Sequence, residues 1–376
     1  MLKRLFKRFL PETVKQAILH MKGKLERLIA TWIVPWAASS RFASQIYYMV
    51  LSRAFAREQQ AVLYGRAKYD ENARRQDRAE EFSLLRRNTH RLEKGLLMQP
   101  RRDVFALGYI KETTKAYSER VRALCNGRNL DEDEAELSWT RDVLEKYFQV
   151  TGTHPKIEAA HQIFRDVEKE VEIDSESPKR GSKDERVPYH RDLNGIPVGY
   201  DALRKLTLKR RSVRWFTEEE VSRESIDKAL SVALQAPSAC NRQPYEFRVY
   251  DDPELVEEIS TLPGGTTGYA ENIPVIVVVV GRLRAYFDER DRHVIYVDAS
   301  LAAMNFMLAL ETMGLASCPI NWPDVEPRER AMEETLSLEP DERPVMLLAI
   351  GHPDPEGLVA YSQKKELSRM RSYNKL

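Results

Sequence analysis

The segment 209–216, with the sequence KRRSVRWF, holds the residue types that bind a phosphate group. Guanidinium groups such as those of Arg210 and Arg214 can donate paired hydrogen bonds to one phosphate, and the hydroxyl of Ser212 adds a further donor. The same string is also typical of a basic surface patch or a kinase site. The segment by itself therefore leaves a phosphate clamp and a solvated patch both open.

A second segment, 236–244 with the sequence APSACNRQP, has the composition of a loop that approaches a flat ligand. Its small residues let the backbone come close, and the side-chain amides of Asn241 and Gln243 offer both donors and acceptors. The loop follows the basic segment by about 25 residues, with one expected helix between them. This order and spacing make the pair of segments more specific than either one.

Other chemistry-bearing residues form weaker sets. His90 and Glu93 stand one helical turn apart, as half of a helical metal pair would, but a second such pair is missing from the sequence. An ion-paired surface is the favoured interpretation, and no metal site is expected. The run 264–268, GGTTG, lacks the lysine of a phosphate-binding P-loop and is expected to be a flexible loop.

The elements around these segments alternate between helix and strand. Thr217 and Glu220 form a capping box, which predicts a helix that opens there and runs to about residue 235. Asp252 and Pro253 predict the start of a short helix. A long apolar helix is expected at 297–313, and strands are expected at 245–250, 273–280 and 345–350. The strand 273–280 is apolar on both faces, so it belongs at the centre of a sheet covered by helices. The fold class is α+β.

Residues 1–172 carry helical patterns with little strand signal. The composition changes at 173–194, which is polar, contains Pro and Gly, and has no apolar period, as is typical of a linker. We therefore expect a helical N-terminal region at 1–172, a linker at 173–194 and a second domain at 195–376.

Composition excludes some classes of protein. The 376 residues carry a formal net charge of +1, so the molecule is not a polyelectrolyte built to bind nucleic acid. With 42% hydrophobic residues it can form real cores. Cys125, Cys240 and Cys318 are odd in number and far apart, which favours a reducing, cytoplasmic setting over a disulfide framework or a zinc site.

The N-terminal residues 1–66 contain about four times as many basic as acidic residues. Apolar residues recur there at helical spacing, at Ile18, Met21, Leu25, Leu28 and Trp32. The uncharged stretch 28–40 is about 13 residues long, too short to span a bilayer. A helix packed on its own protein is favoured, and a basic amphipathic helix at the inner membrane surface is the alternative.

Together these segments resemble the nitroreductase family of FMN flavoproteins over about 180 residues. The family's Arg-Arg-Ser-x-Arg-x-Phe motif is similar to 210–216, and its Ala-Pro-Ser-x-x-Asn-x-Gln-Pro loop is similar to 236–244. Its small-residue dimer helix resembles 298–305, followed by Gly314. Its closing strand, Gly-x-Pro turn and basic tail resemble 345–353 and 364–365. The resemblance implies a central mixed sheet covered by helices and a homodimer formed through the helix 297–313.

The resemblance also implies which residues bind FMN: Arg210, Arg211, Ser212, Arg214, Pro237, Ser238, Ala239, Asn241, Gln243, Pro319, Ile320, Asn321, Lys364 and Lys365. Arg210 and Ser212 would hold the phosphate and ribityl chain, helped by the two lysines. Arg214 would lie by the pyrimidine edge of the ring. The loop 237–243 would reach the flavin of the other subunit, and a turn at 318–322 would border N5, with core packing of Cys318 and Trp322 an equal alternative.

In such an enzyme the flavin N5 carries the hydride, and no side chain is expected to act as acid, base or nucleophile. The stretch 282–293, which builds a helical lid in many relatives, is short here, while nearly 195 residues precede the domain. We therefore expect the helical N-terminal region to cap the site. No nicotinamide motif is visible, which is normal for the family because NAD(P)H and acceptor alternate over one flavin face.

Three functions remain open. The first is NAD(P)H-dependent two-electron reduction of a nitro, quinone or enone compound. The second is a flavin dehydrogenase or oxidase with a dedicated biosynthetic or envelope-linked substrate, for which Arg284, Arg290, Arg292 and His293 make an anionic compound conceivable. The third is a binding or scaffold protein without turnover.

Overall fold

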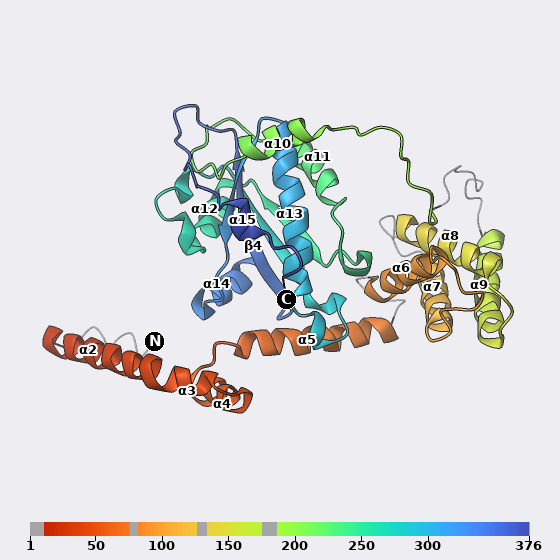
Figure 1. Ribbon diagram of the computed structural model, residues 1–376, viewed down its shortest axis with the longest axis horizontal. Helices are drawn as coiled ribbons and strands as arrows, with labels where there is room; N and C mark the ends of the chain where they lie inside the picture. The colour runs from red at the N-terminus through yellow and green to blue at the C-terminus, as the bar shows by residue number, and fades with distance from the viewer. Residues whose placement is uncertain (1–10, 76–81, 126–133, 175–185, 376) are drawn as a thin grey trace. The chain divides into compact units, whose positions relative to one another are not determined.

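The computed structural model describes residues 11–75, 82–125, 134–174 and 186–375 (Figure 1). The chain divides into two units, Met1–Gln60 and Ala61–Leu376. The linker predicted at 173–194 lies inside the second unit and stays a prediction, because its residues 175–185 fall outside the described ranges.

The regular structure of the first unit, over its described residues 11–60, is helical. Its elements are α2 (Glu12–Leu28), the π-helical turn η1 (Ile29–Ile33), α3 (Val34–Ala38), α4 (Arg41–Ile46) and the π-helical turn η2 (Tyr47–Leu51). Leu28 and Ile33 keep right-handed helical backbone angles, so α2, η1 and α3 continue one another. Ser40 is extended and begins α4 by accepting a hydrogen bond from the Ala43 amide.

The second unit begins with five helices, α5 (Ala56–Arg74, of which the first residues belong to the first unit), α6 (Ser83–Leu96), α7 (Ile110–Cys125), α8 (Glu134–Val150) and α9 (Pro155–Asp174). Helices α6 to α9 have a core of their own, in which Leu85, Leu92, Val143, Leu144 and Tyr147 are fully buried. The helical character expected for 1–172 is therefore present in the described residues of that range, and α6 and α7 are separate helices.

A four-stranded sheet forms the centre of the C-terminal half, in the order β1-β2-β4-β3. The strands are β1 (Tyr245–Tyr250), β2 (Val275–Arg282), β3 (Ala316–Asn321) and β4 (Glu342–Gly351). Each of the three strand pairs is antiparallel. The sheet was expected to be mixed, but its strand pairs are all antiparallel, and a parallel bridge joins Ser317 only to Ser212, which lies outside the strands.

Helices cover both faces of this sheet. Val275, Val277 and Val279 of β2 pack in a core with α11 (Arg223–Ala233) and α13 (Val294–Thr312). The alternate residues Ile276 and Val278 pack on the other face with α12 (Pro253–Thr261) and α14 (Glu326–Leu336). Since successive side chains of a strand point to opposite faces, burial of both sets explains why β2 is apolar throughout. Two further α-helices among the described residues are α10 (Tyr200–Lys209) and α15 (Leu367–Met370).

One helix boundary was predicted wrongly. Helix α11 begins at Arg223 with Ser222 as its N-cap, whose hydroxyl accepts a hydrogen bond from the Ser225 amide. Thr217 instead accepts a hydrogen bond from the Glu219 amide in a local turn, so it does not open the helix. By contrast, Asp252 caps α12 with Pro253 at its first position, as expected.

Among the described residues, one helical stretch, Glu289–Thr312, is long and apolar enough by length and composition to cross a membrane. It contains α13, and half of its most apolar 18 residues are buried within the protein. The core helix of a globular protein can have the same length and composition, and α13 supplies Ala299, Ala302 and Phe306 to the core on one face of the sheet.

Candidate functional site

The basic segment leaves α10 at Arg210 and runs beside the edge strand β3. The Val213 amide donates to the Ser317 carbonyl at 3.2 Å. Phe216 is buried and anchors the segment, because its amide donates to Asn272 Oδ1 at 2.7 Å and its carbonyl accepts from Asn272 Nδ2 at 3.1 Å. The apolar end of the motif thus fixes the position of the basic end.

The guanidinium of Arg210 has buried donors that the described residues leave unsatisfied. Its Nε and Nη1 are both shielded from solvent and have no hydrogen-bond partner among the residues that the structure describes. A buried unsatisfied charged donor is costly, and a phosphate oxygen is the acceptor that such a group binds best. This observation fits an FMN phosphate at Arg210.

The other residues of the segment stand around this point. Ser212 is half-buried and forms the bridge with Ser317. Arg214 is exposed, with its guanidinium 5.7 Å from the centre of the Tyr269 ring. Arg211 is half-buried and donates back to the Arg210 carbonyl at 3.2 Å.

The buried side chains beneath the basic segment include Cys318 and Tyr269. Burial raises the pKa of the Cys318 thiol, while the nearby charges of Arg214 and Arg210 act in the opposite direction. Burial also raises the pKa of Tyr269 to about 12. Both groups are therefore neutral near pH 7 and serve as packing beneath the segment.

The amide loop 238–243 has an unusual backbone. Cys240, Asn241 and Gln243 all have positive φ angles, between 49° and 55°, although none is glycine. Such conformations are costly for non-glycine residues and are concentrated at functional sites. Inside the loop, the backbone N–H of Gln243 donates to the Ser238 hydroxyl at 3.0 Å, and the backbone N–H of Asn241 donates to the Ser238 carbonyl at 3.0 Å.

Two residues that sequence reasoning missed hold this loop from outside. Asp298 of α13 is 4% exposed, and its Oδ2 accepts from the Ala239 amide at 2.9 Å and from the Tyr286 hydroxyl at 3.1 Å. Burial raises the pKa of its carboxyl group, against the effect of these two hydrogen bonds. Its only signal in the sequence was its place at the start of the small-residue helix motif.

The second is Arg86 of α6, in the helical region. Its Nε donates to the Asn241 carbonyl at 2.7 Å, and its Nη2 donates to Gln243 Oε1 at 3.1 Å. Its Nη1 binds Glu136 of α8. One arginine thus ties two helices to the loop, 155 residues further along the chain.

Within one chain, the basic segment and the amide loop stand at opposite corners of the sheet. The loop leads into Tyr245, which pairs with Gly281 near the end of β2. The basic segment lies beside Ser317, which pairs with Ile350, and Ile350 pairs with Val275 at the start of β2. The basic segment and the amide loop are therefore separated by three strand spacings, about 14 Å, across the sheet and by about 20 Å along the strands. One chain therefore does not bring these predicted residues into one site.

The predicted turn at 318–322 is a different element. Residues 316–321 form strand β3, paired with β4, so Pro319, Ile320 and Asn321 belong to an edge strand instead of a turn. Ile320 is buried and Pro319 and Asn321 are exposed, as the two faces of a strand require. Cys318 and Trp322 are buried in the core, and Trp322 Nε1 donates to Glu329 at 2.8 Å. Core packing therefore accounts for both side chains.

The tail lysines lie on the extended segment that follows β4. Lys364 and Lys365 are both exposed, as are their neighbours from residue 358 to 375. In this position they are free to reach a ligand or another subunit.

The short stretch 282–293 is covered by helices α5 and α6. The guanidinium carbons of Arg87 and Arg290 lie 4.4 Å and 5.0 Å from the centre of the Phe287 ring, so both groups stack on it. A Cβ atom on Gly65 of α5 would lie 2.8 Å from Leu283, so only glycine permits this approach. The helical region therefore packs directly on the stretch that sequence reasoning identified as a reduced lid.

Arg284, considered above as part of an anion-binding cluster, is 4% exposed and paired inside the protein. Its Nη2 lies 2.7 Å from Asp341 Oδ1 and 3.1 Å from Glu339 Oε2. A guanidinium neutralised in this way does not attract an anionic substrate, so the predicted role of Arg284 is wrong.

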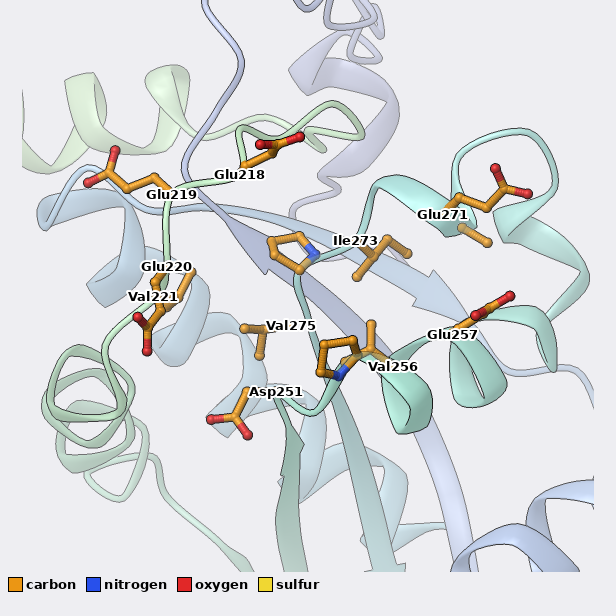
Figure 2. Close-up of a pocket in the computed structure, with 13 residues that line it drawn as sticks. Glu218, Glu219, Glu220, Val221, Asp251, Val256, Glu257, Glu271, Ile273 and Val275 are labelled. Atoms are coloured by element: carbon orange, nitrogen blue, oxygen red, sulfur yellow. The ribbon is translucent and has the colours of Figure 1, made fainter.

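A cavity of about 560 Å³ lies elsewhere on the domain, at the start of β2 (Figure 2). Six carboxylates line it, from Glu218, Glu219, Glu220, Asp251, Glu257 and Glu271. It contains none of the residues predicted to bind FMN, and its negative charge disfavours a phosphate.

Comparisons with known proteins match the same half of the chain. Residues 207–266 and 263–352 match the family model described as Nitroreductase family. A protein named as an NADH dehydrogenase/NAD(P)H nitroreductase, from Archaeoglobus fulgidus, is 31% identical over 156 residues, which are 40% of this chain and 86% of that relative. Iodotyrosine deiodinase 1 from Pongo abelii is 24% identical over 194 residues, and the match spans 44% of this chain and 66% of the deiodinase.

A solved structure, that of an FMN-dependent nitroreductase from Clostridium difficile R20291, is 28% identical with a TM-score of 0.39, covering 46% of this chain and 98% of that one. The extent of the archaeal match and the agreement of the family model with the basic segment, the amide loop and the sheet identify the C-terminal half. The chain belongs to the nitroreductase family, a family of oxidoreductases.

Proposed function

We propose that the protein is an FMN-dependent oxidoreductase that takes two electrons from NAD(P)H and passes them to a small electrophile, such as a nitroaromatic, a quinone or an enone. The observation that carries this proposal is the pair of buried donors on the half-buried Arg210, Nε and Nη1, which have no partner among the described residues. Membership of the family and the strained amide loop support it.

The residues of the basic segment fit distinct parts of FMN. Arg210 would pair with the phosphate, and Ser212 would donate to the phosphate or the ribityl chain. The exposed guanidinium of Arg214 would place a positive charge beside the N1–C2=O edge of the ring, which favours the reduced cofactor. FMN supplies N5, the atom that accepts and returns the hydride. The side chains of the protein would bind and orient FMN and shield it from water.

The separation of the two segments supports a homodimer with shared sites. Because the basic segment and the amide loop cannot meet in one chain, a complete site needs the loop 237–243 of a second copy. Exposed apolar side chains of α13, Val297 at 57%, Leu301 at 44% and Met304 at 37%, offer a surface for that contact. A closed twofold dimer would then contain two equivalent sites.

The helical region would shield the site in place of the reduced lid. Its α6 already contacts the amide loop through Arg86, and α5 packs on Leu283. Exclusion of water above the flavin ring would strengthen the electrostatic interaction of Arg214 with the ring. It would also limit side reactions of the reduced flavin with molecules from the solvent.

A flavin dehydrogenase or oxidase with a dedicated substrate is the second candidate. The relatives named as nitroreductase favour reduction, and the pairing of Arg284 with Asp341 removes one of the residues that suggested an anionic substrate. A scaffold role would leave the buried donors of Arg210 without a purpose.

The decisive experiment is an absorption spectrum of the purified protein, followed anaerobically while NADH and then NADPH are added. We expect flavin absorption that bleaches within seconds with at least one of them. Flavin absorption that persists would favour the dehydrogenase. Protein that stays free of flavin after incubation with FMN would contradict the proposal.

A further inference from the structure

The unit Met1–Gln60 has almost no core of its own. Among its residues whose side chains the structure describes, the buried ones are Ala37 and Ala43. Large apolar side chains are exposed along the whole helical run, including Trp32 at 72%, Phe42 at 73% and Met49 at 75%. Exposed apolar surface on this scale marks a site of interaction.

Helix α2 carries its exposed apolar residues on one face. At 100° per residue, Val14, Ile18, Met21, Leu25 and Leu28 fall within a narrow stripe, and all five are at least 39% exposed. Trp32 and Trp36 extend the stripe into η1 and α3. The stripe is therefore continuous over about six helical turns.

Basic residues flank this stripe. Lys15 and Lys22 lie along one border and Lys24 along the other, on the 100° spacing. Long lysine side chains at such borders can lay their methylenes on an apolar surface and keep the ammonium group in the polar layer above it. Over residues 11–60 there are seven basic and three acidic residues.

The aromatic residues of the unit also favour the boundary between an apolar layer and a polar one. Trp32, Trp36, Tyr47 and Tyr48 combine an apolar ring with a polar N–H or O–H group, the kind of side chain that concentrates where a bilayer meets water. The uncharged stretch 28–40 is too short to cross the hydrocarbon core, so the helix would lie along the surface.

From this apolar stripe, its basic borders and its aromatic residues, we propose that Met1–Gln60 binds the surface of an anionic lipid bilayer, with α2, η1 and α3 lying in the interface. A membrane matches both features of the unit at once, since the hydrocarbon boundary covers the apolar stripe and anionic headgroups attract the excess of basic over acidic residues at 11–60. The proposal is independent of the flavin chemistry.

The test is flotation of the full-length protein with vesicles of phosphatidylcholine alone or with 30% phosphatidylglycerol. We expect binding to the anionic vesicles that weakens as salt is raised. The triple variant Lys15→Glu/Lys22→Glu/Lys24→Glu should bind at least about 100-fold less, since each lysine removed near an anionic surface costs about fivefold and each glutamate adds repulsion. The matched control Lys111→Glu/Lys156→Glu/Lys205→Glu changes three exposed lysines outside the unit and should bind like the unmodified protein.

The apolar stripe is tested separately. Trp32→Ser/Trp36→Ser should lose binding, whereas Tyr189→Ser/Tyr200→Ser, which removes two exposed aromatic rings outside the unit, should retain it. Brominated lipid tails should quench the fluorescence of Trp32 and Trp36. Equal binding of the lysine variant and its control would overturn the proposal. So would a change in the molar mass of the vesicle-free protein on Trp32→Ser/Trp36→Ser, because the stripe would then be a contact between protein chains.

Discussion

The guanidinium of Arg86 donates through Nε to the carbonyl oxygen of Asn241 at 2.7 Å, and this bond joins the helical region to the amide loop. Asn241 has a φ angle of 52°, next to Cys240 at 55°, so the bond holds a backbone that is costly to maintain. The same side chain binds Gln243 and Glu136. Arg86 is thus placed to set the conformation of the loop without being part of the basic segment.

Substitution Arg86→Ala should weaken FMN binding about tenfold, because a charge-assisted hydrogen bond contributes roughly 1.5–3 kcal/mol and the loop is the part of the site that it orders. Fluorescence quenching of free FMN on titration with apoprotein measures the change. Arg91→Ala is the matched control, since Arg91 lies on the same helix but stacks on Tyr109 at 3.7 Å. If the two variants bound FMN equally well and the loop was not cleaved faster in either, the inference that Arg86 supports FMN binding would be wrong.

A shared site predicts that two inactive chains can complement each other. Arg210→Ala damages the basic segment, and Gln243→Ala damages the amide loop, so each homodimer should lose most of its flavin. When the two are unfolded, mixed and refolded, half of the dimers are mixed, and each has one intact site of two, so about a quarter of the sites should recover. Flavin absorption per protein measures the recovery. A mixture that binds no more FMN than its components would contradict a site shared between two chains.

Much of the sheet could be predicted because its signals are local. The strand at β2 is a run of β-branched residues buried on both faces, and Asp252 followed by Pro253 is a cap that depends on neighbouring residues alone. The start of α11 was misplaced because Thr217 and Ser222 carry the same capping chemistry, and Phe216 keeps the chain extended at Thr217 by its bonds to Asn272. A tertiary contact decided between two equal local signals.

The site could be predicted only where its residues are close in sequence. The basic segment and the amide loop are each continuous, so their composition reveals them. Arg86 binds Asn241 across 155 residues, and in the sequence it is one of several charged residues on an amphipathic helix. Cys318 lies in a strand, and not in a turn, because β4 pairs with it through backbone bonds that no local motif records.

The buried pair of Arg284 and Asp341 predicts a large effect on stability. Asp341 is fully buried and receives the backbone amide and two side-chain nitrogens of Arg284. Asp341→Asn removes the charge with little change of shape and should cost about 3 kcal/mol, because breaking a buried ion pair leaves one charge uncompensated. Glu339 remains within 3.1 Å of Arg284 and keeps the loss at the lower end of the usual range.

The midpoint of urea unfolding measures that loss. Asp201→Asn, at an exposed position of α10, is the control and should leave the midpoint unchanged. A midpoint for Asp341→Asn equal to that of the control would show that the pair contributes nothing net to stability.

The thiols should differ in reactivity and in pH dependence. Cys125 is exposed, Cys240 is half-buried and Cys318 is buried. Burial raises the pKa of Cys318, so at any pH below that value less of it is thiolate, the form that reacts with iodoacetamide. We expect Cys125, which is exposed, to be alkylated first at pH 7 and Cys318 last, and the rate at Cys318 should still be rising at pH 9, the ordinary pKa of a cysteine thiol. Mass spectrometry of peptides after timed alkylation measures the three rates, and labelling in 8 M urea provides the control in which the differences disappear. Labelling of Cys318 as fast as Cys125 in the folded protein would mean that β3 and the basic segment beside it open readily, and the unsatisfied donors of Arg210 would then be reached by water.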